Sequence, residues 1–499
     1  MAEGLKAKTV SGVIWTGMQK FGSTLLSFIS TIVLARLLTP ADYGYIGMLA
    51  IFLAIASTLI DGGLGSALIQ KKRPTHEDYS TIFYWNLGLS LVLYLLLFVF
   101  APFIARFYSL PFLCRLLRVE GLVLIIDAVR IVQTSQLRKQ LRFKKIATVD
   151  LSVAAISLVV TVFLAWKGFG FWALVIQQLL VSFLTTSVYW LTGHWLPLLE
   201  FSKKSFKELF SFGGFILLSN LVNTLCNNIQ GLLIGKFYSP ATMGYYSKAQ
   251  STESFASNFV SNVTDQVSYP VLAEAQNDLY RIRHMIKKFL GILAFFTFPV
   301  MIMLIILAKP VFLLLYSERW LDSVPYFQVL CCAGVAMCLQ GINYYAVAAI
   351  GRSSAMFRAT LFKRGVGLLL IIVGLLLWGM KGLLLGVVMS SFIIYFVNAY
   401  LVHIYIGYKI QRQVLDLMPL SFLSILCGAI AYCIGIFIHV HIYILAVIQV
   451  IVFSSLYLGL SYGLKLSAFI DVKDIYTNLK NKVIGRWNNR NRYVSNNRI

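Results

Sequence analysis

The chain has 499 residues, of which 59% are hydrophobic and 12% are charged, and its formal net charge is +24 at pH 7. Soluble domains average about 45–50% apolar and about 25% charged residues, so this composition excludes a soluble protein. The cations lie in short segments between apolar stretches, which is typical of membrane topology rather than of nucleic-acid binding. We therefore expect an all-α polytopic membrane protein that binds no nucleic acid.

Apolar runs and their breaks predict fourteen transmembrane helices, because a span needs about 20 apolar residues. The amino-terminal segment lacks a compact signal-peptide core with a small-residue cleavage site, so we expect the first apolar segment to be retained as a helix. In chain order the predicted spans cover residues 12–35, 43–69, 79–101, 114–135, 147–166, 170–192, 210–235, 243–270, 288–315, 326–350, 360–379, 382–406, 417–438 and 441–463.

The positive charge is distributed unevenly between the two sets of loops that these spans define. One set, together with both termini, contains 31 Lys and Arg residues, and the other set contains 7. The positive-inside rule then predicts that both termini are cytoplasmic, which agrees with an even number of spans.

A repeated corner relates the two halves of the chain. The run "LARLLTPADYGYIGM" begins at Leu34, and "IGKFYSPATMGYYSK" begins 200 residues later at Ile234. Two further matches, at offsets of 208 and 214, pair "APFIARFYS" with "KPVFLLLYS" and "WKGFGFWAL" with "MKGLLLGVV". We expect two parallel six-helix repeats, at 1–195 and 196–410, because each half holds an even number of spans. Two added helices lie at 411–464, and a basic cytoplasmic tail at 465–499 is suited to anionic membrane lipids or to plain solvation.

Three of the predicted helices carry a polar stripe. Packed helices use such residues as contacts of about 0.6 kcal/mol each, but the lysines within two of the stripes favour a shared water-filled cavity between the halves. We predict that its substrate-binding residues are Gln19, Lys20, Ser23, Asn220, Asn223, Asn227, Lys248, Asn258 and Asn262.

Ionisable residues within or at the ends of the helices are costly in a bilayer and are candidates for ion coupling or gating. Asp127 and Arg130 are three residues apart and can form an ion pair, which is the simpler interpretation; a proton or cation relay is the alternative. The full set of candidates is Asp61, Glu120, Asp127, Arg130 and Asp265.

Enzymatic chemistry finds little support in the sequence. The seven cysteines lie in apolar segments without metal-ligand spacing, and "GLLIGK" falls short of a phosphate-binding loop. No outward loop combines a histidine with carboxylates. We therefore expect no catalytic residues, no metal and no cofactor.

Two runs of the sequence resemble those of a known transporter family. The runs "SGVIWTGMQKFGSTLLSFISTIVLARLLTPADYGYIGM" and "DGGLGSALIQKK", with the twofold plan, resemble the polysaccharide-transporter branch of the multidrug/oligosaccharidyl-lipid/polysaccharide flippase superfamily. Within that branch the chain is most similar to the Wzx family, especially its WzxC-like colanic-acid type.

The resemblance implies a V-shaped pair of six-helix lobes that flips an undecaprenyl-pyrophosphate-linked oligosaccharide, such as an O-antigen or capsular repeat unit, across the bacterial inner membrane. Relatives line their cavity with cations, and Lys20 and Lys248 match that role. The chain has fewer mid-helix arginines than lipid II flippases show, which argues against lipid II as substrate. We expect a monomer that works beside a glycan polymerase and co-polymerase.

Two other functions stay open. A drug or organic-cation antiporter of the same superfamily would need a carboxylate in the first half, and Glu120 or Asp127 qualifies. A non-transporting membrane component of glycan assembly is the other alternative. The cationic stripes fit an anionic glycolipid better than an organic cation.

Overall fold

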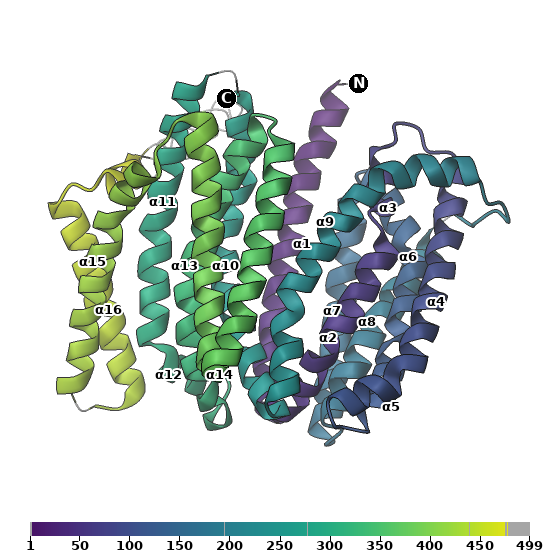
Figure 1. Cartoon of the computed structure of the whole chain (residues 1–499), viewed down its shortest axis with the longest axis horizontal. Helices are drawn as coiled ribbons and strands as arrows, with labels where there is room; N and C mark the ends of the chain where they lie inside the picture. The colour runs from purple at the N-terminus through teal and green to yellow at the C-terminus, as the bar shows by residue number, and fades with distance from the viewer. Residues whose placement is uncertain (1, 194, 277, 439, 475–476, 478–499) are drawn as a thin grey trace, which may run out of the picture. The chain divides into compact units, whose positions relative to one another are not determined.

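A computed structural model describes residues 2–193, 195–276, 278–438, 440–474 and 477. All regular elements among these residues are helical, as expected where backbone groups must find partners within their own segment. They form two compact units, which we describe separately (Figure 1). The first unit comprises Met1–Lys248 and Leu315–Trp320, and the second comprises Ala249–Leu314 and Leu321–Ile499.

The first unit is built from ten helices or parts of helices. They are α1 (Ala2–Leu37), α2 (Pro40–Asp61), α3 (Leu64–Gln70), α4 (His76–Phe107), α5 (Leu113–Glu120), α6 (Leu122–Lys139), α7 (Phe143–Trp166), α8 (Phe171–Thr192), α9 (Lys203–Phe237) and the start of α10 (Pro240–Glu274).

Within this unit α1 packs on α7, α2 on α9, and α6 against both α4 and α8. Among the described residues, one apolar cluster joins α3, α4, α6 and α9, a second joins α6, α7 and α8, and a third joins α1, α7 and α8.

The second unit holds the remainder of α10 and the helices that follow it, except that the segment Leu315–Trp320, with the start of η1, belongs to the first unit. These are α11 (Leu279–Ile306), α12 (Ala308–Leu315), the short 3₁₀ helix η1 (Glu318–Ser323), α13 (Val324–Ala349), α14 (Ser353–Ile406), α15 (Ile410–Phe437) and α16 (Ile442–Gly463). Helix α11 packs on both α13 and α15, and these helices share one large apolar core, while α16 packs beside α15 (Figure 1).

Ten helical segments among the described residues are long and apolar enough to cross a membrane, which makes this a multi-pass membrane protein. The number becomes eleven if the two parts of α9, bent by 58°, form one span. Each of the fourteen predicted spans falls largely within helix, but the count of fourteen stays a prediction. The predicted boundaries at 195/196 and 410/411 also stay predictions.

The helical backbone is interrupted within or at the end of two predicted spans, and each interruption coincides with glycine. The predicted span 43–69 is divided into α2 and α3, because Gly62 and Gly63 adopt φ values of +54° and +68°. Only glycine reaches that region at low cost. Helix α14 runs through two predicted spans, but the backbone of Trp378 and Gly379 is non-helical, at the end of the predicted span 360–379.

The two repeated corners have the same local construction in the first unit. Thr39 caps α2 and forms a capping box with Asp42, and Pro40 occupies the first helical turn. At the second corner, Ser239 Oγ accepts a hydrogen bond from the Thr242 backbone N–H at 3.2 Å, again beside a proline at the start of α10. The sequence match therefore corresponds to matching turns.

Candidate functional site

A polar cavity of about 330 Å³ lies at one end of the first unit, where the basic segments 70–73 and 138–145 also lie. We call it the arginine pocket. Helices α2, α3, α6, α7 and α8 all contribute to its wall, so residues far apart in sequence meet there. It is lined by Asp61, Gly65, Ser66, Ile69, Arg130, Ile131, Thr134, Ser135, Arg138, Ile146, Asp150 and Tyr189.

The break after α2 shapes one wall of this pocket. Asp61 is the last residue of α2 and is exposed at the pocket, and the two glycines that follow turn the chain into α3. Helix α3 then packs on α6 and α9. A side chain at Gly63 would meet the Gly213 carbonyl of α9 at 2.5 Å, so glycine is required both for the turn and for the close approach.

The opposite wall contains a hydrogen-bonded carboxylate. Asp150 Oδ2 accepts from Gln19 Nε2 of α1 at 2.5 Å, and Asp150 Oδ1 accepts from the Tyr189 hydroxyl of α8 at 3.0 Å. Tyr189 is only 3% exposed. Because this carboxylate on α7 accepts hydrogen bonds from donors on α1 and α8, it links three helices at this pocket.

The arginines give the pocket its cationic character. Arg130 Nη2 lies 3.0 Å from Asp127 Oδ1, so the ion pair that the sequence suggested is present. Arg138 is exposed, and its guanidinium has no hydrogen-bond or ion-pair partner among the described residues. A guanidinium in this situation can hold a phosphate or carboxylate group through two parallel hydrogen bonds.

The predicted stripe on α1 is accessible rather than packed. Lys20 is exposed, and Gln19 and Ser23 are half-buried. Two of its hydroxyls are satisfied locally, because Ser23 and Thr24 both donate to the Lys20 carbonyl. On α9, Asn220 and Asn227 are exposed and Asn223 is half-buried, and on α10 of the second unit Asn258 is exposed. Exposed polar faces on apolar helices favour contact with water over helix-to-helix contact.

Lys248 occupies a different environment from the rest of its stripe. It is 2% exposed, and its ammonium lies 3.7 Å from the ring centre of Tyr43, 5.0 Å from that of Trp320 and 5.2 Å from that of Tyr316. The Trp320 indole N–H donates to the Ala35 carbonyl at 2.8 Å and fixes this aromatic cage to α1. The three aromatic rings pack around the Lys248 ammonium. The assignment of Lys248 to the substrate site stays a prediction.

Glu120 is not among the residues that line the arginine pocket. Glu120, at the end of α5, is 1% exposed, and its Oε2 has no hydrogen-bond partner among the described residues. The side chains of Asn262 and Asp265 lie outside the part of the molecule that the structure describes. Within that part, no group of three His, Cys, Asp or Glu side chains is placed to hold a metal ion.

The structure therefore brings together Gln19, Asp61, Asp127 and Arg130 from the predicted set and adds three residues that sequence reasoning missed. The missed residues are Arg138, Asp150 and Tyr189. A signal for Asp150 was available, since it is a single carboxylate near the start of an otherwise apolar helix. Its partners, on α1 and α8, were not visible in the local pattern.

Comparisons with known proteins agree with this architecture. The chain is 24% identical over 440 residues to the lipopolysaccharide biosynthesis protein WzxC of Escherichia coli (strain K12), covering 87% of this chain and 88% of that protein. It is 26% identical over 333 residues to the succinoglycan biosynthesis transport protein ExoT of Rhizobium meliloti (strain 1021), covering 66% of this chain and 67% of that protein.

The fold also has a solved counterpart. The lipid II flippase MurJ, in an inward closed conformation, matches 94% of this chain and 99% of its own length with a TM-score of 0.75 at 16% identity. A family profile described as "Polysaccharide biosynthesis protein" matches residues 33–325, more than half of the chain. The predicted resemblance to the polysaccharide-transporter branch of the flippase superfamily is thus confirmed, and the chain belongs to the polysaccharide biosynthesis protein family.

Proposed function

We propose that this protein flips a lipid-linked oligosaccharide, an undecaprenyl-pyrophosphate glycan repeat unit, across the bacterial inner membrane by alternating access. The relatives' names, which refer to polysaccharide biosynthesis and transport, and the flippase fold support the general activity. Fourteen spans in two parallel six-helix repeats, with both termini in the cytoplasm, are the topology that this mechanism uses. A glycan polymerase and co-polymerase are the partners that would take up the flipped unit.

The observation that carries the proposal is the exposed polar face of α1 and α9. A pyrophosphate cannot enter hydrocarbon unaided, because moving an anion into a low-dielectric medium is costly. Lys20 presents an ammonium on this face, and Asn220 and Asn227 present amides that both donate and accept hydrogen bonds. Such a surface provides a route for a charged, hydroxyl-rich head group while the lipid tail remains in the bilayer.

The arginine pocket supports loading of the substrate from the end that bears the basic segments, which the positive-inside rule places in the cytoplasm. Arg138, unpaired within the described chain, would bind a phosphate of the incoming head group. Asp61 and Asp150 would limit how long it stays, since like charges repel in the same pocket. In this proposal Asp61, Glu120, Asp127, Arg130 and Asp265 remain the candidates for ion coupling or gating.

Reconstituted transport tests the proposal. We expect proteoliposomes to translocate a fluorescent undecaprenyl-pyrophosphate oligosaccharide, measured by its protection from a membrane-impermeant quencher. Lys20→Gln should lower the initial rate about tenfold, because a charge-assisted contact contributes roughly 1.5–3 kcal/mol. Lys203→Gln removes an exposed charge at the start of α9 and serves as the matched control.

The same vesicles distinguish the alternatives. Robust efflux of an organic cation such as ethidium without movement of the glycolipid would replace the proposal with a cation antiporter. No movement of either substrate in correctly folded protein would favour a non-transporting role in glycan assembly.

A further inference from the structure

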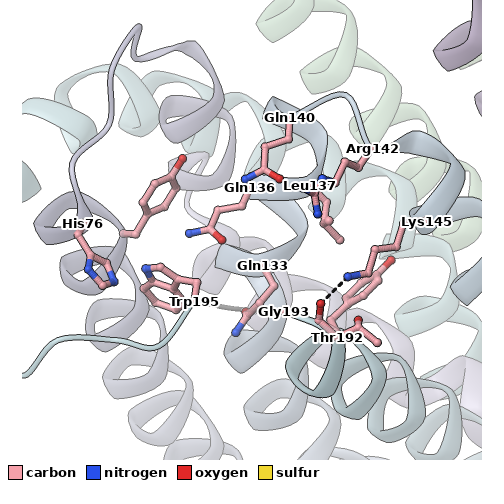
Figure 2. A pocket seen from close by; sticks show the side chains of 12 residues that line it. His76, Gln133, Gln136, Leu137, Gln140, Arg142, Lys145, Thr192, Gly193 and Trp195 are labelled. Atoms are coloured by element: carbon pink, nitrogen blue, oxygen red, sulfur yellow. Dashed lines mark hydrogen bonds between the residues drawn. The ribbon is translucent and has the colours of Figure 1, made fainter. Parts of the chain in front are cut away.

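A second cavity, of about 360 Å³, lies in the first unit and shares Tyr189 with the arginine pocket. We call it the glutamine pocket. Figure 2 shows His76 and Trp195 on one side of it, Arg142 and Lys145 on the other, and the glutamines of α6 between them. It is lined by His76, Tyr79, Gln133, Gln136, Leu137, Gln140, Arg142, Lys145, Tyr189, Thr192, Gly193 and Trp195.

Helix α6 separates the two cavities with two different faces. Gln133, Gln136 and Gln140, which are three and four residues apart, line the glutamine pocket. Arg130 and Arg138 line the arginine pocket. The amide of Gln133, in the orientation that satisfies both its groups, donates to the Val129 carbonyl and accepts from the Trp190 indole. The side-chain amides of Gln136 and Gln140 have no hydrogen-bond partner among the described residues, so they are available to a ligand.

The charged side chains that line the glutamine pocket are all positive among the described residues. Its described lining includes Arg142 and Lys145 and contains no carboxylate. Lys145 Nζ donates to the Thr192 carbonyl at 2.7 Å, which leaves its other two donors available (Figure 2). The Arg142 side chain is exposed and forms no hydrogen bond within the described chain. An anionic group is therefore favoured at this end of the pocket.

The other end is aromatic and held in place. Trp195 lies edge-on to His76, with ring centres 5.7 Å apart, and to Tyr79 at 6.3 Å. The His76 Nε2–H donates to the Leu196 carbonyl at 2.8 Å, and this anchors the segment that carries Trp195 to α4. The Trp195 Nε1–H is buried and has no partner in the described structure, so a donor remains unused in the pocket wall.

We propose that the glutamine pocket binds an acidic monosaccharide unit of the hexuronate type. The aromatic end would contact the C–H face of the sugar ring, the two amides would bind its hydroxyls, and Arg142 with Lys145 would bind its carboxylate. This inference rests on the proposed function, in which the pocket receives a sugar of the glycan before translocation.

The size and composition of the pocket decide between ligand classes. A free phosphate would fill a small part of about 360 Å³ and would leave the aromatic end and both amides unused. A neutral sugar would use the amides but would leave two cations facing an uncharged ring. An acidic sugar uses all three kinds of group at once.

Binding of simple sugars to the full-length protein in nanodiscs tests the inference. The probes are sodium glucuronate and glucose, observed by saturation-transfer NMR, and inorganic phosphate, added as a competitor against the glucuronate signal. We expect glucuronate to bind, glucose to bind at least fivefold more weakly, and phosphate to compete poorly. Glucuronate binding should fall about tenfold in Arg142→Gln, since a charge-assisted contact is lost.

Two further variants make the test specific. Gln136→Glu has nearly the same shape but adds a negative charge, so it should abolish glucuronate binding and weaken the glucose signal far less. Lys204→Gln removes an exposed cation of α9 that does not line the pocket and should bind glucuronate normally. Equal thermal midpoints for all variants exclude misfolding as the cause of a loss.

The outcomes separate this inference from the proposed function. Undiminished glucuronate binding in both Arg142→Gln and Gln136→Glu overturns the inference, as does phosphate competing as strongly as glucuronate, even when glycolipid transport is intact. Glucuronate binding that needs Arg142 in a protein that moves no glycolipid supports the sugar site and refutes the flippase proposal.

Discussion

Gly44 of α2 lies directly against the backbone carbonyl of Pro240, so closely that a Cβ at this position would overlap the carbonyl oxygen. Gly244 of α10 repeats the contact with the carbonyl of Pro40. The two Pro-x-x-x-Gly corners, 200 residues apart in sequence, therefore contact each other reciprocally within the first unit. Each corner supplies the glycine that the other needs.

Replacing either glycine with alanine should destabilise the protein. Because backbone atoms cannot move aside as a flexible side chain can, we expect Gly44→Ala and Gly244→Ala each to cost about 1–3 kcal/mol. The midpoint of thermal unfolding in detergent measures the effect. Gly88→Ala is the matched control, since the added methyl group meets no atom within 4 Å in the middle of α4. A Gly44→Ala midpoint at or above that of Gly88→Ala would contradict the reciprocal contact.

One lysine with two carboxylate partners gives a second prediction. Lys71 Nζ lies 3.0 Å from Asp78 Oδ1 and 3.1 Å from Glu208 Oε2, but Asp78 is 1% exposed and Glu208 is 59% exposed. We expect Asp78→Ala to cost about 3 kcal/mol, because a buried pair is broken, and Glu208→Ala to cost less than about 1 kcal/mol. Thermal midpoints of the two variants provide the comparison, and equal losses would refute it.

The pH dependence of this cluster follows from Lys71. Burial alone would lower the pKa of Lys71, but its hydrogen bonds to Asp78 and Glu208 and their negative charges raise the pKa above its ordinary value of 10.5. A raised folded-state pKa means that the stabilisation is complete below pH 10.5 and is lost as the pH rises through the folded-state value. Between pH 6 and pH 9 this lysine should contribute no change in stability.

The carboxylate of the arginine pocket should stabilise the contacts among three helices. Asp150→Ala removes the hydrogen bonds to Gln19 and Tyr189 together, and we expect a loss of about 2–3 kcal/mol. Tyr189→Phe removes one of them and should cost about 1 kcal/mol. In the double variant the two losses should not add, because both remove the same bond. Tyr432→Phe, at a side chain 60% exposed on α15, is the control, and full additivity would show that the two groups act independently.

The two lysines of the predicted substrate site should differ in reactivity. Lys20 is exposed and Lys248 is 2% exposed within its aromatic cage. A water-soluble amine-acylating reagent should therefore modify Lys20 at least tenfold faster than Lys248, as measured by peptide mass spectrometry over time. The exposed Lys203 reports the rate for an accessible amine at the same pH. Equal labelling of Lys20 and Lys248 would show that the cage opens readily.

Much of the fold could be predicted from the sequence because apolar length is a strong signal in a membrane protein. The break at Trp378 and Gly379 falls at the end of the predicted span 360–379, directly before the predicted gap, since a glycine interrupts the apolar run there. The division of the predicted span 43–69 was missed, although "DGGLG" contains both glycines that cause it. The apolar run 43–69 is long enough to be one membrane span, so its length alone does not reveal that the helix is interrupted within it.

The candidate site was less predictable, because its partners come from distant segments. The stripe containing Lys248 looks like one face of one helix, and nothing in it indicates that Trp320, from 72 residues further along, covers that lysine. Asp127 and Arg130 were paired correctly because their contact lies within one turn. Local ion pairs can be read from helical spacing, whereas cages and pockets depend on which helices become neighbours.

Helix α6 has a consequence for regulation, since it forms a wall common to the arginine and glutamine pockets and Tyr189 lines both. A ligand in either pocket that draws the Tyr189 hydroxyl away from Asp150 changes the affinity of the other pocket. Thermodynamic linkage requires this coupling to be mutual and of equal size in both directions. The protein would then act as a coincidence detector, in which an anionic head group and an acidic sugar are recognised together more selectively than either one alone.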